Sequence, residues 1–249
     1  MRIPRLLRQW ILAFVAPVPL LGVRYLPRYL RDWIRFSGLP GAPRLAFGDS
    51  YPCLIDWVPS TPFDPHYFYQ GGWLARELAA TAPDVHVDVG SSVMMLSVMS
   101  AWVPTVFVDV RPLKAGIARL LPVAGTIERL PFADRSIHSI SCLHVIEHIG
   151  LGRYGDPLDP AGSAGAAREL ARVLGPGGRL YLSTPVGRER ICFNAHRVFS
   201  PGTIFAWFGE FALVSFSIVD DAGVFHPNSS GDSAGSLEYG CGMFVFERR

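Results

Sequence analysis

The segment His-Val-Ile-Glu-His at residues 144–148 concentrates acid–base side chains within five positions. An imidazole titrates close to neutral pH, so either histidine can take a proton from a substrate hydroxyl. We expect His148 to be the general base, with His144 as the second candidate and Glu147 as the third catalytic residue. The same Glu-His pair would also suit capping of the next helix, and this structural interpretation stays open. Three ligands on so short a segment demand special geometry, so we predict no metal site.

A strand that breaks at Gly90 offers a place for a nucleotide-like ligand. Residues 85–89 read Val-His-Val-Asp-Val, as a central parallel strand covered on both faces would. Gly90 has no Cβ, so the backbone there can turn sharply and let a ligand approach. The serine pair that follows can cap the next helix, whose free N–H groups face the same crevice. We therefore expect Asp88, Gly90 and Ser91 to contact a bound ligand.

The elements that must position these residues alternate between strand and helix. We predict strands at 85–89, 105–110, 123–127, 137–143, 179–183, 211–219 and 243–247, and helices at 66–80, 92–100, 113–121, 164–173 and 201–210. This order predicts an α/β, Rossmann-like fold with a seven-stranded, mostly parallel sheet and helices on both faces. The last two strands have no helix between them, which predicts an antiparallel C-terminal hairpin at one edge.

Two polar loops flank the carboxyl ends of the fourth and fifth predicted strands. They carry Asp156, Asn194, His196 and Arg197. Because the carboxyl ends of parallel strands share one edge of a sheet, we expect these side chains to meet and to bind a hydroxylated acceptor such as a sugar. Residues 66–249 lack the basic and aromatic platform of a nucleic-acid binder, so we expect no nucleic-acid partner.

The N-terminal part of the chain differs in composition from the rest. Residues 1–35 carry a net charge of +6, and the remaining residues carry −4. The apolar run at 10–23 is too short to span a bilayer, but arginines recur at helical spacing through 24–35. We divide the chain into a basic apolar arm (1–40), a proline-rich connecting or cover segment (41–65) and the main domain (66–249). The arm can lie on an anionic membrane surface or pack on protein, and these alternatives stay open.

Four stretches together resemble a known family. They are VDVG at 87–90, FVDVRP at 107–112, IERLPFADRSIHSISCLHVIEH at 127–148 and RELARVLGPGGRLYLSTP at 168–185. They resemble class I S-adenosylmethionine-dependent methyltransferases. The stretches HVIEHIGLGRYGDPLDP at 144–160 and PVGRERICFNAHRVFSP at 185–201 resemble a bacterial branch of that superfamily associated with polysaccharide synthesis. One departure is that only Gly90 remains of the family's glycine-rich turn.

The resemblance implies the cofactor and its contacts. S-adenosylmethionine would bind where the first two strands end, with its methionine part near Asp88, Gly90 and Ser91. Asp109 would accept hydrogen bonds from the ribose hydroxyls, while Glu128 and Leu130 would contact adenine. This cofactor site requires that Met94 and Met95 leave the crevice open.

The expected activity is O-methylation of a glycan or another hydroxylated small molecule, in the cytoplasm or peripherally on the inner face of the membrane. The scattered cysteines favour a reducing compartment. A second hypothesis is a non-catalytic module that its basic arm anchors to a membrane or to a glycan-assembly partner. A third hypothesis is a dinucleotide-dependent oxidoreductase, but the sequence lacks the G-x-G-x-x-G motif that is typical of dinucleotide binding.

Overall fold

The computed structural model describes residues 21–111 and 113–249. The chain divides into two compact units, Met1–Phe63 and Asp64–Arg249. Because the described residues begin at 21, most of the apolar run at 10–23 lies outside them.

The described part of the first unit consists of one long helix followed by irregular chain. Helix α2 spans Leu21–Ser37, and the 3-10 helix η1 spans Phe47–Asp49. The guanidinium of Arg28 lies 4.6 Å from the ring centre of Trp57, and its Nη2 donates to the Leu54 carbonyl at 3.4 Å. These contacts tie the proline-rich segment to the helix. Among the described residues, no helix is long and apolar enough to cross a membrane.

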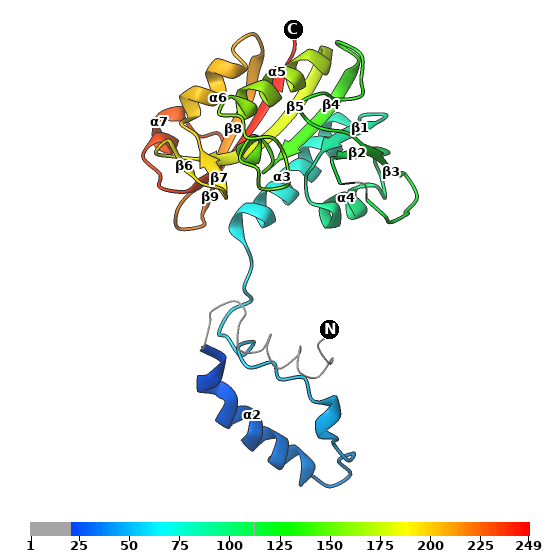
Figure 1. Ribbon diagram of the computed structural model, residues 1–249, viewed down its shortest axis with the longest axis vertical. Coiled ribbons are helices and arrows are strands. Elements are labelled where there is room, and N and C mark those ends of the chain that lie inside the picture. Colours follow the sequence, from blue (N-terminus) through cyan, green and yellow to red (C-terminus); the bar gives the residue numbers. More distant parts are fainter. Residues whose placement is uncertain (1–20, 112) are drawn as a thin grey trace. The chain divides into compact units, whose positions relative to one another are not determined.

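The second unit is built around an eight-stranded sheet with the order β3-β2-β1-β4-β5-β10-β8-β9. Its strands are β1 (His86–Val89), β2 (Thr105–Asp109), β3 (Leu120–Ala124), β4 (Ile137–Leu143), β5 (Leu174–Val186), β8 (Ala212–Val219), β9 (Phe225–His226) and β10 (Gly240–Glu247). The first five pair in parallel, whereas β10 is antiparallel to both β5 and β8. Because β1 and β4 lie side by side, the segments that follow them meet at one edge of the sheet (Figure 1).

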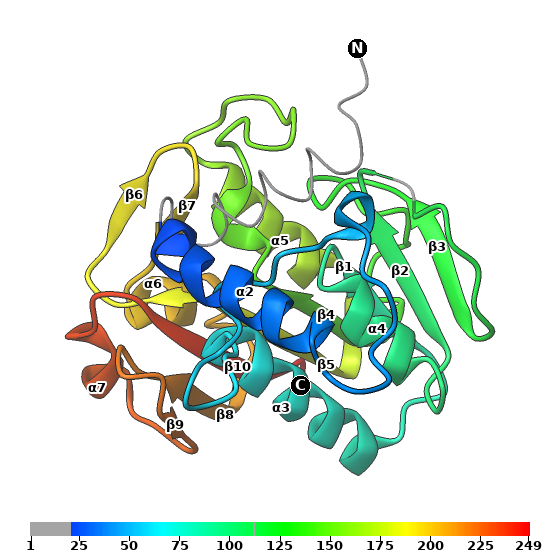
Figure 2. The same cartoon turned by 90° about the horizontal axis from the view of Figure 1, so that it is seen from below.

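Helices cover both faces of this sheet (Figure 2). Helices α3 (Pro65–Thr81) and α4 (Val93–Met99) pack on one face, and α5 (Gly162–Val173) and α6 (Pro201–Trp207) pack on the other. Strand β10 alternates between them: Met243 and Val245 join the α3 side, while Phe244 and Phe246 join the α5 side. Both faces of the central strands are thus buried, as the near-continuous apolar runs in the sequence indicate.

Local signals in the sequence set the helix ends. Asp64 caps α3 by accepting from the Tyr67 N–H at 3.2 Å, and Pro65 occupies the first helical position. Ser200 caps α6 in the same way, followed by Pro201. The short helix α7 spans Gly231–Gly235, and the 3-10 helix η2 spans Ile146–His148.

The predicted fold class is confirmed, but two details of the prediction are wrong. Residues 113–121 are not helical, because Leu120 already begins β3 and pairs with Thr105 of β2. Gly116 disfavours a helix, and the pairing of Leu120 with β2 draws the end of the segment into the sheet. The predicted polar loop that carries Asn194 and His196 contains the hairpin of β6 (Arg190–Cys192) and β7 (His196–Val198).

The antiparallel edge of the sheet is present as predicted and has one strand more than expected. Strands β8 and β10 pair antiparallel as predicted, but β10 lies inside the sheet between β5 and β8. The additional strand β9 forms the edge. The physical reason is that β10 is buried on both faces along nearly its whole length, and so apolar a strand would be costly at an exposed edge.

Candidate functional site

One pocket lies at the carboxyl ends of four parallel strands. Its cavity holds about 260 Å³, close to the lower end of small-molecule pockets, which begin at roughly 300 Å³. The chain after β1, β2, β3 and β4 lines it, together with the loop at 149–157. The lining residues are Val89, Gly90, Val108, Asp109, Val110, Arg111, Gly125, Thr126, Ile127, Glu128, His144, Val145, His148, Ile149, Tyr154, Gly155, Asp156 and Pro157. Met94 and Met95 do not line it, so the crevice is open as the cofactor hypothesis requires.

Gly90 sits in the floor of this pocket with left-handed backbone. Its φ is +69°, and a Cβ added there would lie 3.2 Å from both methyl groups of Val145. The residue therefore has to be glycine for conformation and for space. Ser92 has an ordinary φ of −66°, and Ser91 is not among the residues with positive φ. The turn thus needs only the one glycine that the sequence keeps.

Asp88 and Ser91 face away from the pocket into the protein. Asp88 is fully buried, and its Oδ1 accepts from the Ser91 N–H at 3.0 Å. Its Oδ2 accepts a short hydrogen bond from the Ser141 hydroxyl. The Ser91 hydroxyl accepts from the Leu143 N–H at 3.0 Å. In this structure both residues hold the Gly90 turn against β4, and neither lines the pocket.

Asp109 points into the pocket from the end of β2. Its side chain is 12% exposed, and its Oδ1 accepts from the Arg111 N–H at 2.6 Å. No described group hydrogen-bonds to the other oxygen, Oδ2, so it is available to a ligand. The Arg111 guanidinium lies 4.6 Å from the ring centre of Tyr154, which joins the strand end to the loop that covers it.

The predicted adenine contacts separate in the structure. Glu128 lines the pocket, whereas Leu130 is 3% exposed and belongs to the core on the α5 side. The Leu130 N–H donates to Glu169 at 2.7 Å, which fixes this segment to α5. The apolar side chain that lines the pocket here is Ile127, which our sequence analysis did not select. The signal in the sequence that could have identified Ile127 is its position directly before Glu128, just after β3.

His144 and Glu147 form a buried pair beside the pocket. His144 Nδ1 lies 2.8 Å from Glu147 Oε1, and both side chains are almost completely buried. Burial alone would lower the pKa of His144, but the nearby Cys241 and Glu147 raise it well above the usual range. His144 has a φ of +54°, an unusual backbone conformation for a residue other than glycine. Such local strain is typical of functional positions.

His148 presents one ring nitrogen for acid–base chemistry. Its Nδ1 lies 2.7 Å from the Ala195 carbonyl, so this nitrogen carries the proton and donates it. The lone pair is then on Nε2, which is 3.8 Å from Glu147 Oε1. Burial lowers the pKa of His148, so the ring is neutral at physiological pH. A neutral, pocket-lining imidazole with a free lone pair can act as a general base.

Two of the four predicted acceptor-binding residues organise the surrounding loops. Asp156 lines the pocket, but its carboxylate accepts N–H donors from Gly150, Gly152 and Tyr154. Arg197 is 6% exposed and donates to the Ile149 carbonyl at 2.5 Å and to Ser163 at 2.9 Å. Both residues therefore shape the rim of the pocket in this structure.

The other two lie on the β6–β7 hairpin. Asn194 is at its exposed turn and does not line the pocket. The His196 ring is 5.0 Å from Tyr239, which is 5.2 Å from His66, and His66 in turn is 5.5 Å from His144. A row of polar rings thus continues from the pocket toward the hairpin. His66 and Tyr239 were not predicted from the sequence, because they come from the start of α3 and from the chain before β10.

Sequence comparisons match parts of the chain. The family described as "Caenorhabditis protein of unknown function, DUF268" matches residues 131–219. A demethylmenaquinone methyltransferase from Mycobacterium sp. (strain KMS) is 32% identical over 113 residues, which are 42% of this chain and 43% of that protein. The chain thus spans less than half the length of this curated relative.

Solved structures with the same fold cover most of the chain. The N-methyltransferase NodS from Bradyrhizobium japonicum, in complex with S-adenosylhomocysteine, superposes with a TM-score of 0.53 at 15% identity, covering 88% of this chain and 97% of NodS. A Burkholderia thailandensis 1,6-didemethyltoxoflavin N1-methyltransferase, also with bound S-adenosylhomocysteine, gives a TM-score of 0.50 at 15% identity, covering 77% and 94%. At this identity the likeness shows the fold, a Rossmann-like methyltransferase fold.

Proposed function

We propose that this chain, whose fold is that of the class I methyltransferases, is an S-adenosylmethionine-dependent methyltransferase. The observation that carries the proposal is the strand-end pocket, where Gly90 permits close approach and Asp109 offers an unoccupied oxygen. A carboxylate oxygen there suits the vicinal hydroxyls of a ribose. The sequence relative and the fold neighbours, which are named as methyltransferases, support the same assignment.

The residues of the pocket fit the cofactor. Ile127 and Val145 supply apolar walls, and Glu128 supplies a polar contact at the rim. When bound, S-adenosylmethionine supplies an activated methyl group on a sulfonium. The protein then has to align the acceptor and remove its proton. We propose His148 for this task, and the hydrogen bond of its Nδ1 to the Ala195 carbonyl, which leaves Nε2 to accept a proton, supports the choice.

For the acceptor we propose a glycan or another hydroxylated small molecule. Support comes from the row of rings beside the pocket, which carries the hydroxyl of Tyr239 and the imidazole of His196. Such groups hydrogen-bond sugar hydroxyls and also offer flat apolar surface. The resemblance to the polysaccharide-associated branch favours the same class, and we propose a cytoplasmic location.

Calorimetry with S-adenosylhomocysteine tests the proposal without knowledge of the acceptor. We expect saturable binding by the full chain. In the Asp109→Ala variant we expect binding to weaken tenfold or more, because hydrogen bonds to a charged group contribute about 1.5–3 kcal/mol. Asp84→Ala is the matched control, since Asp84 is an exposed acid at the other end of β1. Absence of heat at millimolar ligand would contradict the proposal.

A second candidate function is a non-catalytic module anchored through the N-terminal arm. It is favoured by α2, which has exposed apolar side chains such as Leu30 and Ile34 beside its arginines. We propose that the arm contacts an anionic membrane surface or a glycan-assembly partner. The two candidates separate experimentally, because only the enzyme requires cofactor binding.

A further inference from the structure

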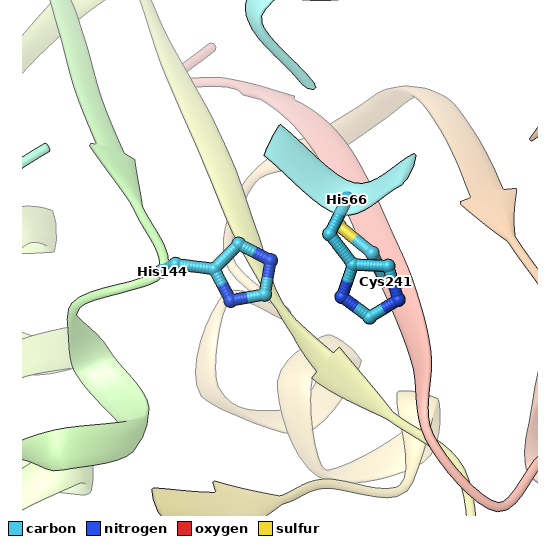
Figure 3. Close-up of side chains that lie close together, drawn as sticks. All are labelled: His66, His144 and Cys241. Atoms are coloured by element: carbon cyan, nitrogen blue, oxygen red, sulfur yellow. The ribbon is translucent and has the colours of Figure 1, made fainter. Parts of the chain in front are cut away.

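Three side chains that commonly bind metals converge from distant parts of the second unit. His66 comes from the first turn of α3, His144 follows β4, and Cys241 lies in β10, as Figure 3 shows. One ring nitrogen of each histidine and the cysteine sulfur all lie within 4.8 Å of one another. In the described part of the chain, this is the one group of three such residues that lies so close together.

The unpartnered nitrogen of His144 is the second observation that points to a ligand. His144 Nε2 is buried and makes no hydrogen bond of normal geometry, whereas Nδ1 pairs with Glu147 at 2.8 Å. Because the carboxylate can only accept, Nδ1 carries a proton, and Nε2 is the ring nitrogen that remains to bind a metal ion. A buried ring nitrogen without a partner is costly, and a metal ion in place of a proton would satisfy it.

His66 is oriented in a similar way. The ring of His66 lies beside the Tyr239 backbone, and the ring plane is inclined by only 16° to that of His144. Metal-binding histidines usually donate their second N–H to a carboxylate or to a backbone carbonyl. Glu147 and Tyr239 provide one partner of each kind.

The Cys241 sulfur points at the same place from the sheet. The side chain is fully buried on the α3 side, and its hydrogen bond to the Gly242 carbonyl is a long one of 3.9 Å. Cysteine is a common zinc ligand, and it binds the metal through its sulfur.

We propose that His66, His144 and Cys241 bind a zinc ion with an open fourth coordination position. Two imidazoles and one thiolate are typical zinc ligands, and three protein ligands are typical of sites that keep one position open. Ligand atoms sharing a tetrahedral zinc lie roughly 3.3–3.8 Å apart, so the cluster contracts by about 1 Å on binding. The proposal differs from a site on residues 144–148, because Glu147 supports His144 rather than contacting the metal.

The position of this site connects it to the acceptor. His144 lines the strand-end pocket as well as the metal cluster. A hydroxyl of the acceptor can therefore occupy the open position next to the transferable methyl group. That assignment rests on the proposed function, but metal binding itself does not.

Cobalt titration of the full-length, metal-stripped protein tests the site. We expect one equivalent of Co²⁺ to bind, with a thiolate-to-cobalt charge-transfer absorption, and we expect Zn²⁺ to displace it. Cys241→Ser should abolish the charge-transfer band, while Cys192→Ser, which changes a cysteine outside the cluster, should retain it. No stoichiometric uptake, or an unchanged band in Cys241→Ser, would overturn the proposal.

Two further variants keep the test valid if Cys241→Ser fails to fold. His66→Gln changes a half-buried residue at a helix start and should weaken zinc binding at least tenfold, whereas the exposed control His138→Ala should not. Glu147→Gln should weaken it about 10–100-fold, as loss of a supporting carboxylate typically does. Circular dichroism checks each fold, and unchanged affinity in both variants would refute the site. Calorimetry with S-adenosylhomocysteine on the metal-free protein reports separately on the proposed function.

Discussion

The hydrogen bonds of the carboxylate oxygens distinguish the roles of two aspartates. Asp88 and Asp109 lie on the neighbouring strands β1 and β2. Both oxygens of Asp88 are taken by groups that hold the Gly90 turn, whereas Asp109 keeps one oxygen free toward the pocket. Burial raises the pKa of Asp88 to about 6.

Substitution of Gly90 should damage both folding and cofactor binding. Gly90→Ala introduces left-handed strain of about 1–2 kcal/mol and places a methyl group against Val145. Gly177→Ala is the matched control, because Gly177 has a φ of +70° but nothing near its missing Cβ. In urea unfolding both variants should lose stability. In calorimetry only Gly90→Ala should bind S-adenosylhomocysteine more weakly, and equal binding by the two variants would refute the close approach.

His148 should titrate below the ordinary imidazole range. Burial lowers its pKa from 6.5 more than the neighbouring Glu147 and the Ala195 carbonyl raise it. The base form therefore persists to lower pH than in a free histidine. An NMR titration can measure this directly, with His148→Gln assigning the resonance. A pKa at or above 6.5 would contradict the assignment. Once an acceptor is found, the same variant should reduce kcat by about 10²–10⁴-fold.

At the scale of elements, helix α2 is organised into two opposite faces. Arg24, Arg28, Arg31 and Arg35 fall on one side at 3.6 residues per turn, and the aromatic and aliphatic residues fall on the other. Ile34 is 71% exposed and Leu30 is 46% exposed. A basic helix with exposed apolar side chains is typical of contact with a membrane surface or a partner.

Vesicle co-sedimentation distinguishes these two uses of α2. We expect the full chain to sediment with phosphatidylserine-containing vesicles and less with neutral ones, since each basic residue contributes about 1 kcal/mol near an anionic surface. Arg31→Glu with Arg35→Glu should largely abolish sedimentation. The control Arg76→Glu, on the exposed side of α3, should not. Equal sedimentation of both variants would remove the membrane interpretation and leave a protein partner.

Helix α5 connects the family-like stretches at 127–148 and 168–185. Glu169 on α5 accepts from the Leu130 N–H at 2.7 Å, and Arg172 donates to the Phe132 carbonyl and to Asp134. These contacts fasten the segment before β4 to the helix before β5. The motif residues thus hold up the pocket wall, and few of them line the pocket itself.

At the scale of the whole molecule, a buried polar row crosses the sheet on the α3 side. His86 hydrogen-bonds Ser139 and Ser141 at 2.8 Å each, and Ser141 donates to Asp88. Because Ser141 has a single proton, His86 Nε2 must donate to it and Nδ1 must accept from Ser139. The row fixes β1 against β4 and is held together by a neutral histidine.

This histidine should make the protein sensitive to acid. Burial lowers the pKa of His86 from 6.5 to about 3, so its stabilising contribution is complete above pH 6.5 and is lost as the pH falls toward 3. Asp88 acts in the opposite sense, because its raised pKa favours the folded state at low pH and this is lost as the pH rises through about 6.

Comparison with His86→Gln isolates the histidine, since Asp88 is common to both proteins. In urea unfolding between pH 7 and pH 4, the wild type should lose roughly 3 kcal/mol more stability than His86→Gln. The Tyr181 ring, 6.2 Å away, is also present in both proteins. Parallel pH profiles would show that His86 does not titrate as its burial requires.

The sequence by itself determined the fold class, the strand-turn-helix at Gly90 and the acid at the end of β2, because these depend on local periodicity and on short-range backbone chemistry. It also located the His-Val-Ile-Glu-His segment beside the pocket. Hydrogen bonds between residues far apart in sequence decided the rest. They turned Asp88 and Arg197 into structural groups, drew residues 120–124 into a strand and placed β10 inside the sheet. The convergence of His66, His144 and Cys241 likewise exists only in three dimensions, since it depends on how α3 packs across β4 and β10.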